Sequence, residues 1–290
     1  MSSLATKISW TEVTANPIAG CTKVSQGCDH CYALTMALRL ARIASARLEA
    51  GQRLGRLAPY LDVVDMATGE WTDAIVEVPD VLADFTRWKK PKQVFVNSMS
   101  DLFHKSVTPA YRNQVFDAME AAPHHRYQIL TKRSSVMRDF VLQRYGGPTP
   151  DFIWCGASLE SETELVRADH MRAIGGWLSL EPLLSPLPGI NLVGIPWIVI
   201  GGESGAGARP CMSDWISDLI KIARCHGSIV YVKQLGARSD IAVHGKGDDP
   251  ADWPEALRCR HFPPGLDPKA LAGGSVPAIC GEAGRCHETT

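Results

Sequence analysis

The stretch QVFVNSMSD, residues 93–101, passes from a short apolar run into small and polar residues. This pattern is typical of a buried strand that reaches the surface at its carboxyl end. Five further runs of the same kind follow along the chain, beginning at Tyr127, Phe152, Gly176, Trp197 and Ile229. The recurrence predicts strands of similar construction, each ending in groups that can bind a ligand.

Helix-like stretches separate most of these runs, at residues 108–122, 134–146, 161–175 and 213–227. Several begin with Ser or Thr, and Pro109 directly follows Thr108, a combination that favours a helix start. Strands that alternate with helices indicate βαβ units, a parallel sheet and an α/β fold. One more strand leading into a cysteine-rich segment brings the predicted number to seven. That number favours a (β/α) barrel, whole or partial, over a sandwich, with a doubly wound open sheet as the alternative.

Length and composition limit the class of protein. The chain has 290 residues, of which 45% are hydrophobic and 21% charged, and its net charge is −1. These values are ordinary for a globular protein and give no overall positive field that would draw it to nucleic acid or an anionic membrane. The segment MSSLATKISW lacks the features of a signal peptide, and no apolar run reaches the roughly 18 residues of a membrane helix. We therefore expect a cytoplasmic protein with no membrane partner.

The organisation along the chain predicts one main domain and an extension. Residues 1–236 contain the strand and helix pattern, interrupted by a mixed loop or insert at about 52–80. Residues 237–290 are rich in Gly, Pro and Asp and are expected to be irregular and to lie on the surface. Cys280 and Cys286 in this extension are interpreted as incidental thiols in preference to a second metal site.

Three cysteines, Cys21, Cys28 and Cys31, stand close together in GCTKVSQGCDHCYAL, residues 20–34. Disulfides are rare in a reducing cytoplasm, so clustered thiols there favour a metal. Zinc is one alternative, but a structural zinc site needs four ligands, and the fourth here would have to be His30 or a remote residue. Three thiolates without a fourth fit a [4Fe–4S] cluster with one open iron.

Several segments of the chain together resemble a known superfamily. The segments ISWTEVTANPIAGCTKVSQGCDHCYA, VFVNSMSDLFH, ILTKR, WLSLEPLL, WIVIGGESGAGARP and VYVKQLG span residues 8–236 in consistent order. They resemble the radical S-adenosylmethionine (SAM) superfamily, and most closely a phage- and prophage-associated radical-SAM-like family with a Cys-x6-Cys-x2-Cys motif. The usual superfamily spacing is Cys-x3-Cys-x2-Cys, so this loop is longer. The resemblance implies a partial TIM-like (β/α) barrel with a [4Fe–4S] cluster held by the loop at residues 21–31.

The resemblance also implies a set of SAM contacts. The superfamily has a Gly-Gly-Glu-like motif after its second strand, where this chain has NSMSD without the glycines. Ser98 and Asp101 are the expected SAM ligands there, and Ser158 and Glu160, after a later strand, are candidates for ribose contacts. The GGES sequence at residue 201 comes too late in the chain to be that motif. No catalytic residue is singled out.

A phage context favours a DNA base as substrate. The leading hypothesis is an isomerase that moves a glycine substituent on thymidine during DNA hypermodification, which protects phage DNA from restriction, in the cytoplasm of a bacterial host. The basic run at residues 87–92, with Trp88, and the pair Lys132–Arg133 offer phosphate and stacking contacts. A flavodoxin or ferredoxin would donate electrons. The alternatives are a radical SAM enzyme acting on a protein or small molecule, of the lyase or repair type, and a non-catalytic zinc- or cluster-binding protein.

Overall fold

Strand β4 (Gln93–Val96), with which the predicted repeat begins, is buried along its whole length. It pairs in parallel with β1 (Val13–Ala15) on one side and with β5 (Arg126–Thr131) on the other. These strands belong to the first of two compact units, residues 1–133, and the second unit comprises residues 134–290. The computed structural model describes residues 6, 8–205 and 207–267.

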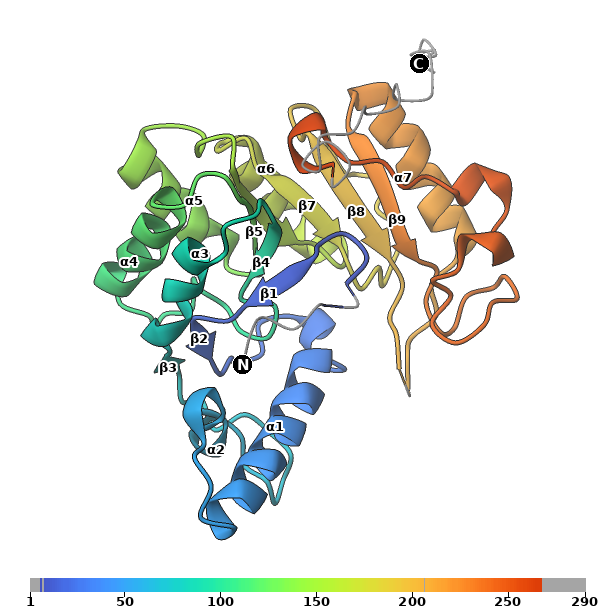
Figure 1. Ribbon diagram of the computed structural model, residues 1–290. Helices are drawn as coiled ribbons and strands as arrows, with labels where there is room; N and C mark the ends of the chain where they lie inside the picture. The colour runs from blue at the N-terminus through green and yellow to red at the C-terminus, as the bar shows by residue number, and fades with distance from the viewer. Residues whose placement is uncertain (1–5, 7, 206, 268–290) are drawn as a thin grey trace. The chain divides into compact units, whose positions relative to one another are not determined.

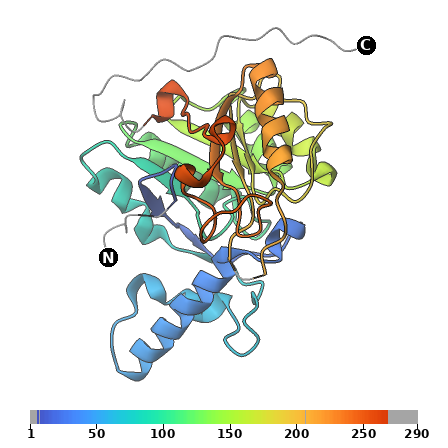
Figure 2. The same ribbon diagram turned by 90° about the vertical axis from the view of Figure 1, so that its right-hand side faces the viewer.

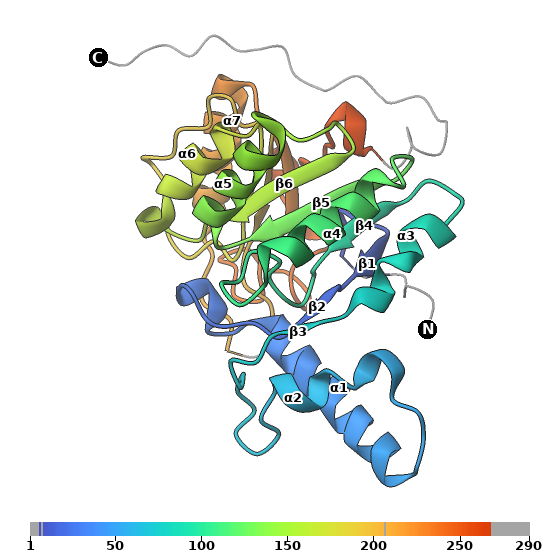
Figure 3. The same cartoon turned by 90° about the vertical axis from the view of Figure 1, so that its left-hand side faces the viewer.

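Helices cover one face of the strands in the first unit. Phe85, in α3 (Ala83–Arg87), packs edge-on against Tyr127 of β5, with 5.0 Å between the ring centroids. Helix α4 (Pro109–Glu120) runs beside the same strands (Figure 3). The Thr108 hydroxyl accepts a hydrogen bond from the backbone N–H of Tyr111 at 3.1 Å, so Thr108 caps α4 as the sequence predicts.

The segment predicted as a loop or insert contains short elements that pack on α1 (Tyr32–Glu49). Helix α2 (Tyr60–Val63) follows a 3-10 turn, η2 (Gly55–Leu57), and lies alongside α1 (Figure 1). Their contact is a small apolar core in which Ala37 and Ala41 meet Tyr60 and Val63. Because alanine carries so little side chain, the two helices approach closely. Strand β3 (Val76–Glu77) then pairs antiparallel with β2 (Ile18–Ala19), and η3 (Pro79–Val81) follows.

The second unit repeats the parallel pattern. Its strands lie in the order β6 (Ile153–Ser158), β7 (Trp177–Leu180), β8 (Trp197–Gly201) and β9 (Ile229–Gln234), each parallel to its neighbour. The connecting helices are α5 (Ser134–Tyr145), α6 (Val166–Arg172) after the 3-10 turn η4 (Glu162–Glu164), and α7 (Ser213–His226). Trp177 and Trp197 form the centre of its core, with 4.8 Å between their ring centroids.

The predicted α/β fold is confirmed, with the repeated parallel strands and connecting helices of a partial TIM-like (β/α) barrel. All six apolar runs picked out in the sequence form strands, and the seventh predicted strand corresponds to β1. None of the described helices combines the length and the apolar character needed to cross a bilayer.

The described part of the C-terminal extension is irregular, as predicted, but it is anchored in the second unit. Its helical elements among the described residues are the 3-10 turns η5 (Pro250–Asp252), η6 (Glu255–Leu257) and η7 (Pro264–Leu266) (Figure 2). The Arg260 guanidinium lies 4.9 Å from the ring centroid of the buried Trp253 and 5.7 Å from that of Tyr231 in β9. Cys280 and Cys286 lie outside the described residues.

Candidate functional site

A glycine turns the chain into the cysteine loop, which we define as residues 21–31. Gly20 has a φ of +91°, and a Cβ atom at this position would clash with the carbonyl oxygen of Ala74. The loop then forms the 3-10 turn η1 (Gln26–Cys28), and Cys31 occupies the N-cap position of α1. The loop is therefore held at both ends, by the turn at Gly20 and by the start of a long helix.

All three thiols of the cysteine loop are free. Cys28 is buried and accepts a hydrogen bond from the backbone N–H of Val24 at 3.4 Å, whereas Cys21 and Cys31 are partly exposed. The charge of Cys31 acts on the titration of Cys21, and the charge of Cys28 acts on that of Cys31. Cys31 thus lies close enough to each of the other two thiols for charge to act between them.

The surroundings of the thiols set their pKa values. Burial and the negative charge of Asp101 raise the pKa of Cys21 to about 12, and the Arg133 guanidinium opposes this increase. Burial also raises the pKa of Cys31, opposed by the backbone N–H groups of Ala33 and Leu34 in the first turn of α1. Both thiols are therefore protonated at neutral pH in the metal-free protein, and binding a metal would release their protons.

The chemistry of the donor set fits an iron–sulfur cluster. Such clusters are held by Cys thiolates, and this loop supplies three free thiols. Among the described residues, we find no group of three or more His, Cys, Asp or Glu side chains arranged to hold a metal ion. The assignment of Cys21, Cys28 and Cys31 as cluster ligands stays a prediction.

Asp101 lies at the centre of a buried network next to the cysteine loop. Its Oδ2 atom is 2.7 Å from Nη1 of Arg133. Its Oδ1 atom accepts hydrogen bonds from the Thr131 hydroxyl at 2.7 Å and from the backbone N–H of Phe103 at 2.9 Å. The Nη2 atom of Arg133 donates to the Thr22 hydroxyl at 2.7 Å. This predicted SAM ligand thus contacts the end of β5 and is linked through Arg133 to Thr22, the residue after Cys21.

Ser98, the other predicted SAM ligand of the first unit, also contacts the start of α1. Its hydroxyl donates to Oδ1 of Asn16 at 3.2 Å, and its carbonyl oxygen accepts a hydrogen bond from the Tyr32 hydroxyl. Tyr32 directly follows Cys31 in the sequence. The structure therefore brings Ser98 and Asp101 to opposite ends of the same cysteine loop.

Asn97 is a site residue that the sequence did not single out. It follows β4 with a φ of +61°, a conformation that asparagine tolerates better than most residues. Its side chain is 2% exposed, yet neither the oxygen nor the nitrogen of its amide has a hydrogen-bond partner among the described groups. A buried amide without partners is costly, and such a group indicates a ligand that completes it.

Ser158 and Glu160 lie in the second unit, at and just beyond the end of β6. The Arg167 guanidinium, from α6, is 2.7 Å from both the Glu160 carboxylate and the carbonyl oxygen of Ser158. The side chains of Glu160 and Arg167 are 1% and 9% exposed, so this ion pair is buried. The predicted ribose contact of Glu160 would have to be made by a carboxylate that already pairs with an arginine.

The other carboxylates at strand ends of the second unit are paired in the same way. Glu203, after β8, is 2.6 Å from Nη2 of Arg209. Glu181, after β7, is 3.0 Å from the ammonium group of Lys233 in β9. The strand ends of this unit thus balance their charges within the unit.

The basic residues proposed for phosphate contacts occupy different positions in the first unit. The run at residues 87–92 precedes β4 and therefore lies at the amino edge of the strands, whereas the cysteine loop lies at their carboxyl edge. Arg87 pairs with Asp84 at 2.7 Å, and the Trp88 ring packs on Phe85 and His125. Lys132 and Arg133 follow β5 and lie at the carboxyl edge, and Lys132 acts electrostatically on Cys31.

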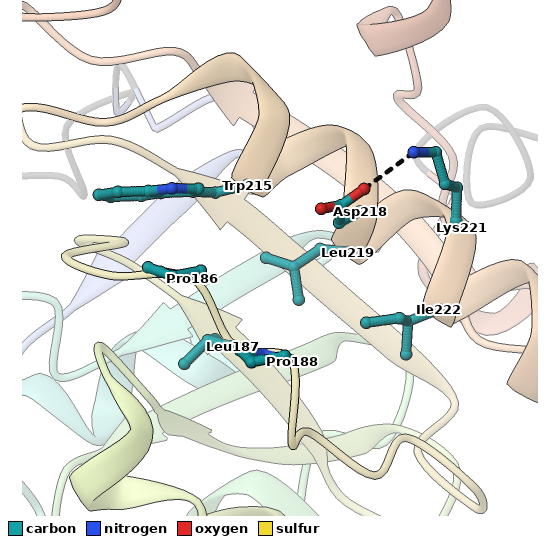
Figure 4. A pocket seen from close by; sticks show the side chains of 8 residues that line it. All are labelled: Pro186, Leu187, Pro188, Trp215, Asp218, Leu219, Lys221 and Ile222. Atoms are coloured by element: carbon teal, nitrogen blue, oxygen red, sulfur yellow. Dashed lines mark hydrogen bonds and ion pairs between the residues drawn. The ribbon is translucent and has the colours of Figure 1, made fainter.

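A pocket of about 270 Å³ lies in the second unit, between α7 and the chain after β7 (Figure 4). Apolar side chains dominate its lining, with Trp215 and Leu219 from α7 facing Pro186, Leu187 and Pro188. None of the predicted site residues lines it.

Comparisons with known proteins give one family and a group of solved structures. Spore photoproduct lyase complexed with dinucleoside spore photoproduct aligns with 12% identity over 72% of this chain and 58% of that chain, with a TM-score of 0.38. A double variant of that lyase with bound AdoMet and dinucleoside spore photoproduct aligns with 13% identity over 68% of this chain, with a TM-score of 0.37. The chain spans 58% of the length of both lyase structures.

No curated protein matches the sequence. The family model described as "Protein of unknown function (DUF5131)" matches residues 5–255, which is most of the chain. The chain therefore belongs to the DUF5131 family.

Proposed function

We propose that the protein is a radical SAM enzyme in which Cys21, Cys28 and Cys31 hold a [4Fe–4S] cluster. One observation carries the proposal: three free thiols share one loop at the carboxyl edge of parallel strands. Ligands bind at that edge in parallel α/β folds. When bound, such a cluster supplies the electron that cleaves SAM, and the resulting 5′-deoxyadenosyl radical removes a hydrogen atom from the substrate.

Residues after β4 would bind the methionine part of SAM. The Asn97 amide offers one acceptor and two donors without partners among the described groups, which match an amino group and a carboxylate. Ser98 and Asp101 follow it in the sequence; Ser98 contacts Tyr32, the residue after Cys31, and Asp101 pairs with Arg133, which contacts Thr22. Ser158 and Glu160 remain the proposed ribose contacts from the second unit.

As substrate we propose a DNA base, with isomerisation of a glycine substituent on thymidine as the reaction. Lys105 and Lys132 support an anionic substrate because both place positive charge at the carboxyl edge, Lys105 acting on His104 and Lys132 on Cys31. A base within a duplex would have to be flipped out to reach this edge. A flavodoxin or ferredoxin of the bacterial cytoplasm would donate the electron.

The experiment is anaerobic reconstitution with iron and sulfide, followed by reduction with dithionite in the presence of SAM and chromatography for 5′-deoxyadenosine. Cys28→Ala tests the loop, and Cys155→Ala is the matched control because Cys155 is a buried free thiol in β6 of the second unit. We expect brown protein and 5′-deoxyadenosine from the wild type and from Cys155→Ala, and neither from Cys28→Ala. Protein that binds zinc instead, or that carries a cluster but ignores SAM, would contradict the proposal.

The substrate class is tested by what stimulates SAM cleavage. Thymidine nucleosides or DNA carrying a glycine substituent should stimulate SAM cleavage, and the product should keep the mass of the substrate, because 5′-deoxyadenosine gives a hydrogen atom back to the rearranged substrate radical. Stimulation by a peptide or a metabolite, with no response to DNA, would leave the radical SAM assignment intact and reject the DNA substrate.

A further inference from the structure

Arg133 joins the end of β5 to the beginning of the cysteine loop. Its Nη2 atom contacts two atoms of Thr22, the hydroxyl at 2.7 Å and the carbonyl oxygen at 3.3 Å. Thr22 is the residue after Cys21, so these contacts fix the backbone on the carboxyl side of that cysteine. The Arg133 side chain is 14% exposed, and its charge is therefore little screened by solvent.

Asp101 determines where the guanidinium lies. Its Oδ2 atom accepts a hydrogen bond from Nη1 of Arg133. Its Oδ1 atom accepts hydrogen bonds from the Thr131 hydroxyl and from the backbone N–H of Phe103. A carboxylate with three such partners cannot rotate freely, and a guanidinium is a rigid planar fork. The orientation of Asp101 therefore directs Nη2 of Arg133 to Thr22.

His104 holds Thr22 from another direction. The Nδ1 atom of His104 accepts a hydrogen bond from the backbone N–H of Ser106 at 3.2 Å, so in the neutral ring the proton is on Nε2. Nε2 then donates to the Thr22 hydroxyl oxygen at 2.9 Å. That oxygen accepts hydrogen bonds from both His104 and Arg133, so the Thr22 side chain is fixed in one rotamer.

The same guanidinium places a positive charge beside the proposed ligand Cys21. Its Nη2 atom contacts the hydroxyl and the carbonyl oxygen of Thr22, the residue directly after Cys21. Such a charge bears on a cluster bound there, because hydrogen bonds to cluster sulfurs and nearby charges set the reduction potential.

We propose that Arg133, oriented by Asp101, is a positioning residue for the [4Fe–4S] cluster, which holds Thr22 and thereby Cys21 in place and favours the reduced cluster through its positive charge. This inference rests on the proposed cluster but not on the identity of the substrate. It assigns Asp101 a role in the cluster's surroundings whether or not it also contacts SAM.

Two measurements made without SAM test the inference: the reduction potential of the cluster, followed by electron paramagnetic resonance during a redox titration, and the rate at which a chelator removes iron. Arg133→Met removes both the charge and the contacts to Thr22. We expect a more negative potential and an increase in the rate of iron loss of about tenfold or more. Arg133→Lys keeps the positive charge but lacks the planar guanidinium that contacts Asp101 and Thr22 together. The reduction potential of its cluster should stay near that of the wild type, while its iron is lost faster.

Thr22→Val and Thr22→Ser form a matched pair that separates positioning from general damage. Valine has nearly the shape of threonine without the hydroxyl, so Thr22→Val should lose iron faster than Thr22→Ser, which keeps the hydrogen bonds. Circular dichroism and thermal unfolding of the metal-free variants show whether each is folded, and this pair still tests the proposal if Arg133→Met does not fold.

The outcomes separate this inference from the proposed function. If the wild type assembles no [4Fe–4S] cluster, both are wrong. If the wild type assembles the cluster and cleaves SAM, while folded Arg133→Met and Thr22→Val keep the wild-type potential and iron retention, the proposed function stands and the positioning role of Arg133 is wrong.

Discussion

At the carboxyl ends of their strands, the two units use the same kinds of polar residue in different ways. In the second unit, Glu160 pairs with Arg167 at 2.7 Å and Glu203 with Arg209 at 2.6 Å. In the first unit, the Asp101–Arg133 pair lies next to three free thiols, and the buried Asn97 amide has no partner among the described groups.

The difference indicates which edge is built for a ligand. Buried charges that are paired within their own unit need nothing further to satisfy them. A buried amide without partners among the described groups is satisfied only when something binds, and three free thiols in one loop are a donor set for a cluster. We therefore assign the cluster, and the methionine part of SAM, to the first unit. We interpret the Glu203–Arg209 pair of the second unit as structural, whereas Glu160 would meet the ribose while paired with Arg167.

The largest effect on folding is expected in the second unit. Arg167→Met removes the arginine that pairs with the buried Glu160 carboxylate and should lower the free energy of unfolding by about 3–5 kcal/mol, measured by urea denaturation. The double variant Glu160→Leu/Arg167→Met should recover most of that loss, because an apolar pair replaces the charges. Iron content after reconstitution should stay at the wild-type level in the double variant. A loss of iron there would contradict the assignment of the cluster to the first unit alone.

A medium effect is expected at Asn97, on binding and not on folding. Glycine adopts the φ of +61° without strain, and its introduction removes a buried amide that lacks partners among the described groups, so Asn97→Gly should change the unfolding free energy by less than about 1 kcal/mol. SAM affinity of the reconstituted protein, measured by anaerobic calorimetry, should fall about tenfold, as expected for one or two lost hydrogen bonds.

Asp73→Gly is the backbone control for this prediction, since Asp73 is the other non-glycine residue of the described chain with a positive φ, at 64°. Its SAM affinity should equal that of the wild type. Unchanged affinity in Asn97→Gly would mean that the buried amide serves no ligand.

The smallest effect is a pH dependence that His104 contributes to the first unit. Burial, and then the charge of Arg133, lower the pKa of His104 from its usual 6.5. The unfolded chain therefore binds a proton at a higher pH than the folded protein does, and stability falls as the pH drops below 6.5, until the folded histidine is protonated as well. Urea unfolding at a series of pH values should show a shallower decline for His104→Gln, which can still donate to Thr22. Equal slopes for the two proteins would contradict the neutral, donating His104 in the network.

The strands could be predicted from the sequence because burial imposes a local pattern. QVFV, residues 93–96, is apolar over consecutive positions, as expected for a strand buried on both faces, and it forms β4. The cysteine loop could also be recognised from a local signal, because its three thiols stand within eleven residues.

The site network could not be predicted because its members meet only in the folded chain. Arg133 contacts Thr22 across 111 positions, and His104 contacts Thr22 across 82, with no local pattern to mark either pair. Glu160 and Arg167 are seven positions apart, but only the turn from β6 into α6 brings their side chains together. Asn97 was visible as a polar residue at a strand end, whereas its lack of hydrogen-bond partners among the described groups is a property of the packing.

The most direct test of the central claim is the electron paramagnetic resonance spectrum of the reduced, reconstituted wild-type protein, recorded with and without SAM. If the three thiols of the first unit hold a cluster with an open iron, the reduced protein gives a [4Fe–4S]⁺ signal whose g values change when SAM is added. A cluster signal that SAM leaves unchanged, or a protein that gives no cluster signal after reconstitution, would contradict the assignment of the first unit as the SAM-binding edge.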